Sequence, residues 1–193
     1  MLKKITFLKD HRCFKKGDTF DFEPLTILVG DQGCGKSTIL QLLSSAGSKQ
    51  TDETVKITAD RIETRAFDYE KNNPRMSHTV ETMIDVVTRF ASHGQFVKKL
   101  NKSMTEQEGV CWLQDEPDSA LSIRSCLDLA KHIKIALKKG CQVITSIHSP
   151  IVMEQFDKVY SLEHRKWMRT IEFIKWHMTT ELGVAGPADR RRA

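Results

Sequence analysis

Eight consecutive residues near the start of the chain have the types and spacing that hold phosphate. Residues 30–37 are Gly-Asp-Gln-Gly-Cys-Gly-Lys-Ser, which matches the phosphate-binding pattern G-x-x-x-x-G-K-[ST]. Glycines let backbone N–H groups converge on an anion, and a helix that starts at this point adds its partial positive charge. In such a P-loop Lys36 reaches the β- and γ-phosphates, and the hydroxyl of Ser37 binds Mg²⁺. The sequence therefore predicts a nucleoside triphosphate site at Gly30, Asp31, Gln32, Gly33, Cys34, Gly35, Lys36, Ser37 and Thr38.

Two adjacent carboxylates, Asp115 and Glu116, follow the mostly apolar run 110–114. An acidic residue at the C-terminal end of a buried parallel strand lies where such sheets bind ligands. There Asp115 is placed to hold Mg²⁺, and Glu116 is placed to accept a proton from an attacking water. Adjacent carboxylates also fit a solvated turn, but their position after a P-loop favours the metal and base roles.

The longer run 115–122, Asp-Glu-Pro-Asp-Ser-Ala-Leu-Ser, resembles the Walker B and D-loop segment of ABC-type ATPases. His148, after the apolar run 142–147, is similar to the switch histidine of that family, which contacts the γ-phosphate. The resemblance spans most of residues 1–165 and points to small, soluble ABC-type ATPases, similar to SMC and RecF-like proteins. It implies an α/β P-loop NTPase fold of the ABC type, a mostly parallel sheet flanked by helices, with a reduced helical insert. It also implies ATP and Mg²⁺ as cofactors, and Lys36, Glu116 and His148 as catalytic residues.

The LSGGQ signature of ABC transporters is missing in that form, and the best candidate is Ser-His-Gly-Gln at residues 92–95. A Ser and a Gly before a helix can offer a hydroxyl and a backbone N–H to a phosphate. The resemblance implies that this phosphate belongs to ATP on the opposite subunit. A plain connection between a helix at 79–90 and one that carries Phe96, Val97 and Leu100 fits the same segment. The residues expected to act in trans are Ser92, His93, Gly94, Gln95 and Ser119.

Two further positions have open alternatives. The loop after residues 64–67 lacks the Gln found in transporters and SMC proteins, and either Asp68 or Glu70 could take its metal-side role. We assign Glu70 to the metal site, although both carboxylates fit exposed loop charges equally well. Arg12 matches a position where SMC and RecF-like proteins often place a basic residue near the nucleotide. We assign it to the ATP site, although it fits a solvated hairpin charge equally well.

The elements that must position these residues alternate between strands and helices, which favours a parallel sheet covered on both faces. Apolar runs at 25–29, 110–114 and 142–147 predict buried strands, and residues 5–25 resemble the N-terminal strand pair of SMC and RecF-like ATPases. Helices are predicted over 38–43 and 122–139, the second ended by Gly140. The predicted core positions of that second helix are Ile123, Cys126, Leu127, Ala130, Ile133 and Leu137.

Length and composition fit one ATPase domain over residues 1–182, because 193 residues with 39% hydrophobic side chains can bury a proper core. A helical insert is expected at residues 76–105. In the stretch 163–180, Trp167, Phe173 and Trp176 are predicted to pack a terminal helix onto the domain. Residues 183–193 predict a disordered basic tail, which ends in three of the arginines behind the net charge of +5.

The same features argue against several classes of protein. No stretch approaches the roughly 20 apolar residues of a membrane span, and the N-terminus has no signal-peptide core, so we expect no membrane insertion. Five cysteines without metal-site spacing favour a reduced, cytoplasmic setting. Ser37 and Ser92 are separated by about 55 positions (92 − 37), which leaves no space for the coiled-coil arms of SMC proteins.

We therefore expect an ATP-hydrolysing ABC-type ATPase that works as an ATP-dependent homodimeric switch. DNA-related or defence processes are the leading expectation, with DNA or a separate effector protein as candidate partners. Two alternatives stay open: the energising ATPase subunit of a membrane transporter, and a nucleotide-dependent binding module with little turnover.

Overall fold

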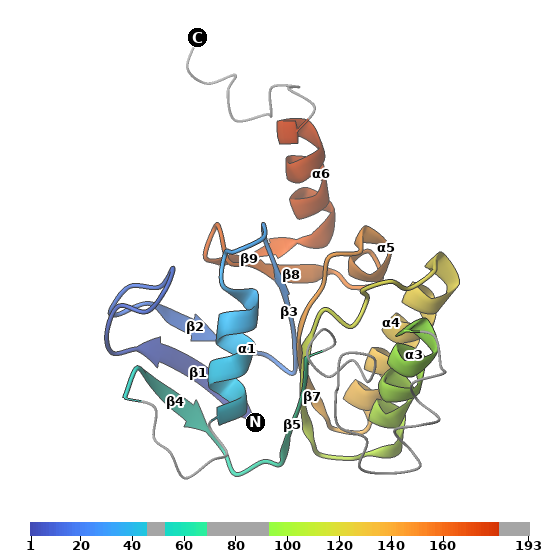
Figure 1. The fold of residues 1–193 in the computed structure, drawn as a ribbon, viewed down its shortest axis with the longest axis horizontal. Coiled ribbons are helices and arrows are strands. Elements are labelled where there is room, and N and C mark those ends of the chain that lie inside the picture. Colours follow the sequence, from blue (N-terminus) through green and yellow to red (C-terminus); the bar gives the residue numbers. More distant parts are fainter. Residues whose placement is uncertain (46–52, 69–92, 182–193) are drawn as a thin grey trace.

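The structure is a computed structural model that describes residues 1–45, 53–68 and 93–181 (Figure 1). Several sequence-based predictions fall outside this part of the chain. They concern Glu70, Ser92, the helix at 79–90, most of the helical insert and the basic tail. Among the described residues, no helix has both the length and the apolar character needed to cross a membrane.

A six-stranded sheet forms the centre of the fold, with the strand order β5-β6-β7-β3-β8-β9. Its first five strands run parallel, and β9 pairs antiparallel with β8 at one edge. The predicted mostly parallel sheet is therefore confirmed, as are the three strands expected from apolar runs. The strand bounds are Thr64–Asp68 for β5, Cys111–Asp115 for β6, Gln142–Ser146 for β7, Leu25–Val29 for β3, Lys158–Ser161 for β8 and Lys166–Arg169 for β9.

A smaller antiparallel sheet, in the order β2-β1-β4, lies beside the first one. It consists of β1 (Leu2–Phe7), β2 (Thr19–Asp21) and β4 (Val55–Ala59), so the expected N-terminal strand pair is present. The two sheets are joined through Gln142, whose side chain is completely buried. The Leu2 N–H donates to its Oε1 at 2.8 Å, and its Nε2 donates to the carbonyls of Leu2 at 2.8 Å and Glu23 at 3.1 Å.

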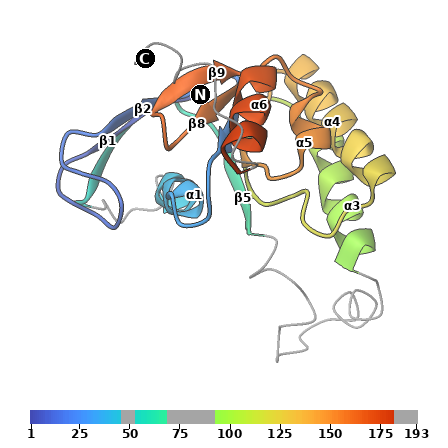
Figure 2. The same ribbon diagram turned by 90° about the horizontal axis from the view of Figure 1, so that it is seen from above.

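The helices form layers on both faces of the central sheet. Figure 2 shows α1 between the two sheets and α3, α4 and α5 on the other side of the central sheet. The helix α6 follows β9 and stands at the upper end of the molecule in Figure 1. The bounds are Lys36–Ser45 for α1, His93–Ser103 for α3, Met104–Glu106 for the short 3-10 helix η1, Ile123–Lys138 for α4, Pro150–Met153 for α5 and Thr170–Glu181 for α6.

The central strands are apolar along their whole length because both of their faces are covered. Side chains alternate across a strand, so Leu28 of β3 packs toward α1 and the small sheet, while its neighbours Ile27 and Val29 pack toward α4. In the same way Leu113 of β6 joins the first core and Trp112 joins the second. This double burial holds the strand ends, where the predicted site residues lie, in fixed positions.

The predicted core face of α4 is wrong at its first turns. Ile123 is 67% exposed and Leu127 is 36% exposed, whereas Leu129 and Ile133 are fully covered. The helix carries more apolar residues than one face can hold, and the face that packs on the sheet is centred between Leu129 and Ile133. The predicted core positions that are buried are Cys126, Ala130 and Ile133, and Leu137 is half-buried.

The predicted terminal helix begins later than expected, at Thr170. Trp167 lies in strand β9 and packs edge-on against Tyr160 of β8 rather than on a helix. Phe173 is buried beneath α6, as predicted, but Trp176 is 40% exposed and contacts the ring of His164. A short β8–β9 turn, with Arg165 at a positive φ of 52°, separates the strand from the preceding chain and was not visible in the pattern of aromatic residues.

Candidate active site

The P-loop connects the end of β3 to the start of α1, the strand–loop–helix arrangement that its pattern predicts. Gly35 has a φ of +107°, which L side chains rarely adopt. Space is also closed there: a Cβ on Gly35 would lie 2.7 Å from Cys13 Sγ and 2.7 Å from Phe14 Cε2. The Phe14 ring stacks on Phe7 in the core of the small sheet. The loop therefore sits directly on an aromatic cluster that leaves no space for a side chain.

Gly33, two residues earlier, has the unusual backbone angle of Gly35 but not its lack of space. Its φ is +83°, but a Cβ would meet nothing within 4 Å. We expect Gly33→Ala to destabilise the fold by roughly 1–2 kcal/mol through backbone strain alone. Gly35→Ala adds displacement of Phe14, an overpacking effect of about 1–3 kcal/mol more. Chemical denaturation measures the free energy of unfolding of both variants, and Gly35→Ala should be the less stable one. Equal values would show that displacing Phe14 costs no stability.

Lys36 is nearly buried, and its ammonium group is held by the loop itself. Nζ donates to the carbonyl oxygens of Gly30 at 2.7 Å and Asp31 at 3.0 Å. Cys34 lies beside it, with its Sγ 3.9 Å from Nζ. Burial raises the pKa of the Cys34 thiol, against a smaller opposite effect of Lys36, so this group stays protonated at neutral pH. The lysine is the positive charge of the loop, and the cysteine is a packing residue.

Arg12 comes to the P-loop from the hairpin that follows β1. Its Nη1 donates to Thr38 Oγ1 at 3.1 Å, and its backbone has a positive φ of 53°. This part-buried hydrogen bond argues against the alternative that Arg12 is only a solvated hairpin charge. The structure thus brings Arg12 beside the first turn of α1, next to the predicted nucleotide residues.

The two predicted carboxylates of the Walker B segment lie at the end of β6, as the sequence indicated. Ser146, at the end of the neighbouring strand β7, connects them. Its hydroxyl donates to Asp115 Oδ1 at 2.7 Å and accepts the Glu116 backbone N–H at 2.8 Å. Sequence reasoning missed Ser146, because only the parallel pairing of β6 with β7 brings it to these residues.

Asp68 is the described carboxylate that lies beside Asp115. The parallel register of β5 and β6 pairs these two residues directly at the ends of their strands. Both line a cavity of about 290 Å³ that α1 closes with Leu40, Gln41 and Ser44. Carboxylate oxygens match the preference of Mg²⁺. Ser37, another predicted ligand, is half-buried at the start of α1 and does not line this cavity. Of the two candidates for the metal-side role, Asp68 is the one whose position is described.

Glu116 and His148 form a direct pair across the ends of β6 and β7. His148 Nε2 lies 3.0 Å from Glu116 Oε1, and Glu116 has a φ of 54°. Asp118 holds the backbone at His148 in place, because its Oδ2 accepts the backbone N–H groups of His148 at 2.9 Å and Ser149 at 2.5 Å. This role of Asp118 could not be predicted from the sequence, because its partners are 30 and 31 residues away.

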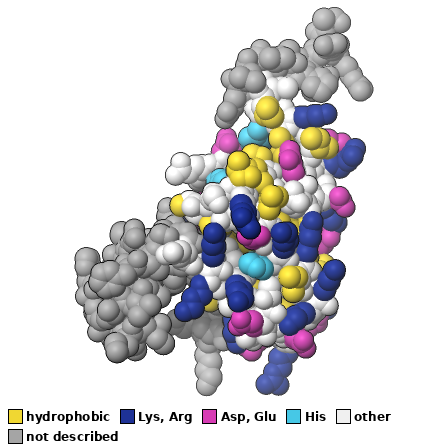
Figure 3. Space-filling model, turned by 90° about the vertical axis from the view of Figure 1, so that its right-hand side faces the viewer, with side chains coloured by type: hydrophobic (Ala, Val, Ile, Leu, Met, Phe, Trp, Pro, Cys, Tyr) yellow, Lys and Arg dark blue, Asp and Glu magenta, His cyan; other side chains and the backbone are white. Residues whose placement is uncertain are grey.

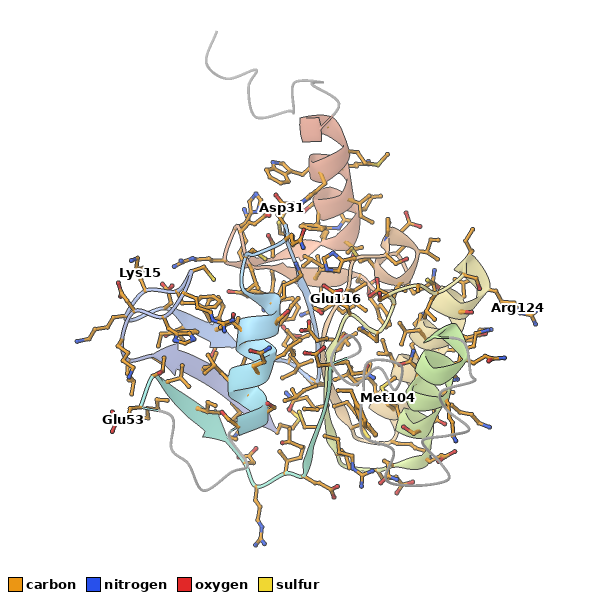
Figure 4. The ribbon with its side chains drawn as sticks, viewed as in Figure 1. Lys15, Asp31, Glu53, Met104, Glu116 and Arg124 are labelled. Carbon is orange, nitrogen blue, oxygen red and sulfur yellow. The ribbon has the colours of Figure 1, made fainter. Side chains whose placement is uncertain are left out.

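One cavity of about 430 Å³ brings the start of the P-loop and the Glu116–His148 pair together. In Figure 4, Asp31 in the loop after β3 and Glu116 at the end of β6 lie in the same region of the molecule, below α6. The full lining consists of Gly30, Asp31, Gln32, Glu116, Ile147, His148, Met153, Phe173 and His177. This arrangement can place the terminal phosphate of a bound nucleotide between the start of the P-loop and a carboxylate–imidazole pair.

Of the residues expected to act in trans, those that the structure describes do not line this cavity. Ser119 lies half-buried between β6 and α4, and its N–H donates to the Glu116 carbonyl at 3.1 Å. His93, Gly94 and Gln95 form the first turn of α3, which lies across the central sheet from α1 (Figure 2). Ser92 lies outside the described residues.

Comparison with protein families classifies the chain. A family model described as an AAA domain, AAA_23, matches residues 7–146, which is most of the chain. The chain belongs to the AAA_23 family. No curated protein matches it.

Solved structures show the fold of this AAA_23 domain. The chain is similar to the dimeric structure of MJ0796, a bacterial ABC transporter cassette, with 12% identity over 88% of this chain and 99% of that one, and a TM-score of 0.58. It is also similar to cbiO1 from Clostridium perfringens, part of the ABC transporter complex cbiONQ, with 13% identity over 90% and 89% of the two chains and a TM-score of 0.49. The family match, the strand order and the similarity to MJ0796 together show that this AAA_23 domain has the fold of a small ABC-type P-loop ATPase.

Proposed function

We propose that this AAA_23 protein binds and hydrolyses ATP in the cavity between the P-loop and the Glu116–His148 pair. The observation that carries the proposal is the convergence of three independent sequence motifs on this one cavity. Lys36 offers its ammonium to the phosphates, and Arg12 supports the first turn of α1 through Thr38. The proposed nucleotide-binding set is the one predicted from sequence, with Arg12 included as a flanking cation.

The chemical step that we propose is water attack on the γ-phosphate. Glu116 accepts the proton of the water, and His148, 3.0 Å from it, stabilises the charge that develops on the phosphate. Ser37, Asp115 and Asp68 are the groups that would hold Mg²⁺, with Glu70 as a further candidate outside the described residues. When bound, this ion would neutralise charge on the β- and γ-phosphates.

We further propose that two copies of the chain share each ATP. In this arrangement the P-loop of one subunit faces Ser92, His93, Gly94, Gln95 and Ser119 of the other, and ATP closes the dimer as a switch. Support comes from the position of α3 away from the P-loop of its own chain, and from the dimeric structure of the similar ABC cassette.

Mixing two inactive variants tests this sharing. Ser92→Arg places bulk and charge in the proposed interface, and Lys36→Ala removes the phosphate-binding cation. We expect each to hydrolyse ATP poorly alone, whereas a mixed dimer keeps one complete site. An equal mixture should then recover up to about a quarter of wild-type turnover, since half the dimers are mixed and each has one good site of two.

Light scattering in the presence of ATP supplies the control for this experiment. Ser92→Arg should remain monomeric under conditions in which wild-type protein dimerises. If Ser92→Arg dimerises and turns over like wild type, the segment is a helix connection, and the shared site is wrong.

A basic surface on α3 and α4 favours a polyanionic partner such as DNA. The two helices together carry seven Lys and Arg residues and one Asp, a formal charge of +6 (7 − 1), whereas the whole chain is +5. Figure 3 shows these dark blue side chains gathered on one face of the molecule. The basic residues are Lys98, Lys99, Lys102, Arg124, Lys131, Lys134 and Lys138, and all of them are exposed.

Charge reversal on this surface tests the choice of partner. We expect Lys131→Glu, Lys134→Glu and Lys138→Glu together to weaken duplex DNA binding on the order of tenfold or more at low salt. A matched control reverses three exposed lysines elsewhere, Lys16, Lys56 and Lys166. Fluorescence anisotropy at several salt concentrations measures both. Equal losses in the two triple variants would mean that net charge alone, rather than this surface, attracts DNA.

The similarity to a transporter cassette supports a second candidate function, that of the energising subunit of a membrane transporter. Capture of partners by the ATP-locked Glu116→Gln form separates the two roles. Recovery of a membrane permease favours the transporter role, and recovery of DNA or a DNA-bound effector favours the switch. Tight ATP binding with negligible turnover in the wild-type chain would instead favour a nucleotide-dependent binding module.

A further inference from the structure

Three metal-ligating side chains from distant parts of the chain meet beside the P-loop: Asp31, Glu163 and His177. One ligand atom from each lies within 4.8 Å of the others. His177 Nε2 is 3.6 Å from Asp31 Oδ1 and 3.8 Å from Glu163 Oε2. Asp31 belongs to the P-loop, Glu163 to the β8–β9 turn and His177 to α6, so three separate elements supply the set.

The histidine is oriented as a ligand. Its Nδ1 lies 3.3 Å from the backbone oxygen of Phe173, and a carbonyl oxygen can only accept, so Nδ1 carries the proton. In the neutral ring, the lone pair of Nε2 then faces two carboxylates. Three atoms that can each offer a lone pair to an ion therefore lie within 4.8 Å of one another. An imidazole that donates its other N–H to a backbone carbonyl is the usual arrangement around metal-bound histidines.

The two carboxylate oxygens of Glu163 have different partners. Its Oε1 accepts the backbone N–H of Asp31 at 2.6 Å, which fixes the carboxylate against the P-loop. Its Oε2 is the oxygen that faces His177. The His177 ring is also held by packing, 4.2 Å from the Phe173 ring and 4.8 Å from the Trp176 ring, measured between centroids. Two of the three ligands are therefore held in place before any ion binds.

The spacing and the donor types define the class of ion. A tetrahedral ion with bonds of about 2.1 Å holds its ligand atoms about 3.4 Å apart. The two separations from His177 Nε2, 3.6 Å and 3.8 Å, are close to this value. An imidazole ligand favours Zn²⁺ and its first-row neighbours over Mg²⁺ and Ca²⁺. We propose that Asp31, Glu163 and His177 bind a divalent transition-metal ion of the Zn²⁺ class, with a fourth position open to solvent.

This site is separate from the predicted Mg²⁺ position at Asp115 and Ser37, and it stands whether or not the chain hydrolyses ATP. Its consequence is mechanical. A bound ion links α6 and the β8–β9 turn to the first variable residue of the P-loop. Asp31 and His177 also line the cavity that contains Glu116 and His148, so the ion lies at the edge of the proposed active site.

Titration of nucleotide-free protein with Zn²⁺ tests the proposal by calorimetry and thermal unfolding. Wild-type protein is expected to bind one ion per chain and to melt at a higher temperature with it. His177→Gln and Glu163→Gln should each weaken binding at least about tenfold and lose the shift in melting temperature. The matched control is His164→Gln, which changes a histidine next to Glu163 whose Nδ1 contacts Ser161 instead. Melting of all variants without metal shows that each is folded.

Three outcomes would overturn the site. One is wild-type protein that binds no Zn²⁺, which would leave His177 as a proton-bearing ion-pair partner. Another is a folded His177→Gln protein that binds like wild type. A third is a sulfur-to-metal charge-transfer band in the Co²⁺-loaded protein, because it would place the ion on a cysteine thiol, such as the exposed Cys13 or the half-buried Cys34. Millimolar Mg²⁺ is expected to leave Zn²⁺ affinity unchanged.

Discussion

Lys36→Ala is expected to remove most of the affinity for ATP, by roughly 10²-fold or more, since each hydrogen bond from a charged donor contributes about 1.5–3 kcal/mol. The ammonium of Lys36 is the nearly buried cation of the P-loop, and it already lies within 3.0 Å of two loop carbonyls. In the complex the same group turns to the β- and γ-phosphates. Calorimetric titration with a slowly hydrolysed ATP analogue measures the loss.

Two controls make this result interpretable. Lys16→Ala removes an exposed lysine of the hairpin that precedes the P-loop, and ATP affinity should not change. Thermal unfolding of Lys36→Ala shows whether the loop survives the loss of a donor to Gly30 and Asp31. A folded Lys36→Ala protein with near wild-type affinity would show that the P-loop does not hold the phosphates.

Glu116→Gln is expected to keep ATP binding and to slow turnover by roughly 10²-fold or more, the usual scale for a lost general base. The amide has the shape of the carboxylate, and its oxygen can still accept a hydrogen bond from His148 Nε2. In the wild-type protein this nitrogen lies 3.0 Å from Glu116 Oε1. Only the ability to take a proton disappears. Phosphate release at saturating ATP measures the rate, and the affinity for ATP is measured on the same sample.

His148→Ala is the companion change at the same pair. It leaves the carboxylate in place, so hydrolysis should slow by a smaller factor, with little effect on binding. Unchanged steady-state turnover in Glu116→Gln would exclude the base role. A loss of ATP affinity equal to that of Lys36→Ala would instead assign Glu116 to binding.

The sequence was informative wherever one local pattern determines the structure. The glycines of residues 30–35 predict a strand-to-helix turn because few other residues adopt that backbone. The runs around Ile27, Leu113 and Ile144 are apolar without alternation, which is typical of parallel strands covered on both faces. The mostly parallel sheet and the helix after the P-loop were predicted from these two signals together with the family resemblance, whereas the order of the strands was not.

Contacts that depend on pairing between distant strands could not be predicted. Ser146 reaches Asp115 only because β6 and β7 lie side by side, and Asp118 reaches His148 only through the same neighbourhood. Glu163 meets Asp31 over a separation of 132 residues. Neither residue type nor spacing marks such partners, since one Ser or Asp in a loop resembles any other.

The side-chain links of Gln142 have a consequence for how the protein can move. Gln142 begins β7 and is bonded to the first strand of the small sheet, while Ser146 and His148 lie at and just beyond the far end of the same strand. A hinge between the two sheets would have to break the two buried hydrogen bonds between Gln142 and Leu2. The hairpin with Arg12 and the strand end with His148 therefore travel as one rigid body. If ATP drives a change of shape, we expect the displacement where this body meets the second copy of the chain in the proposed dimer.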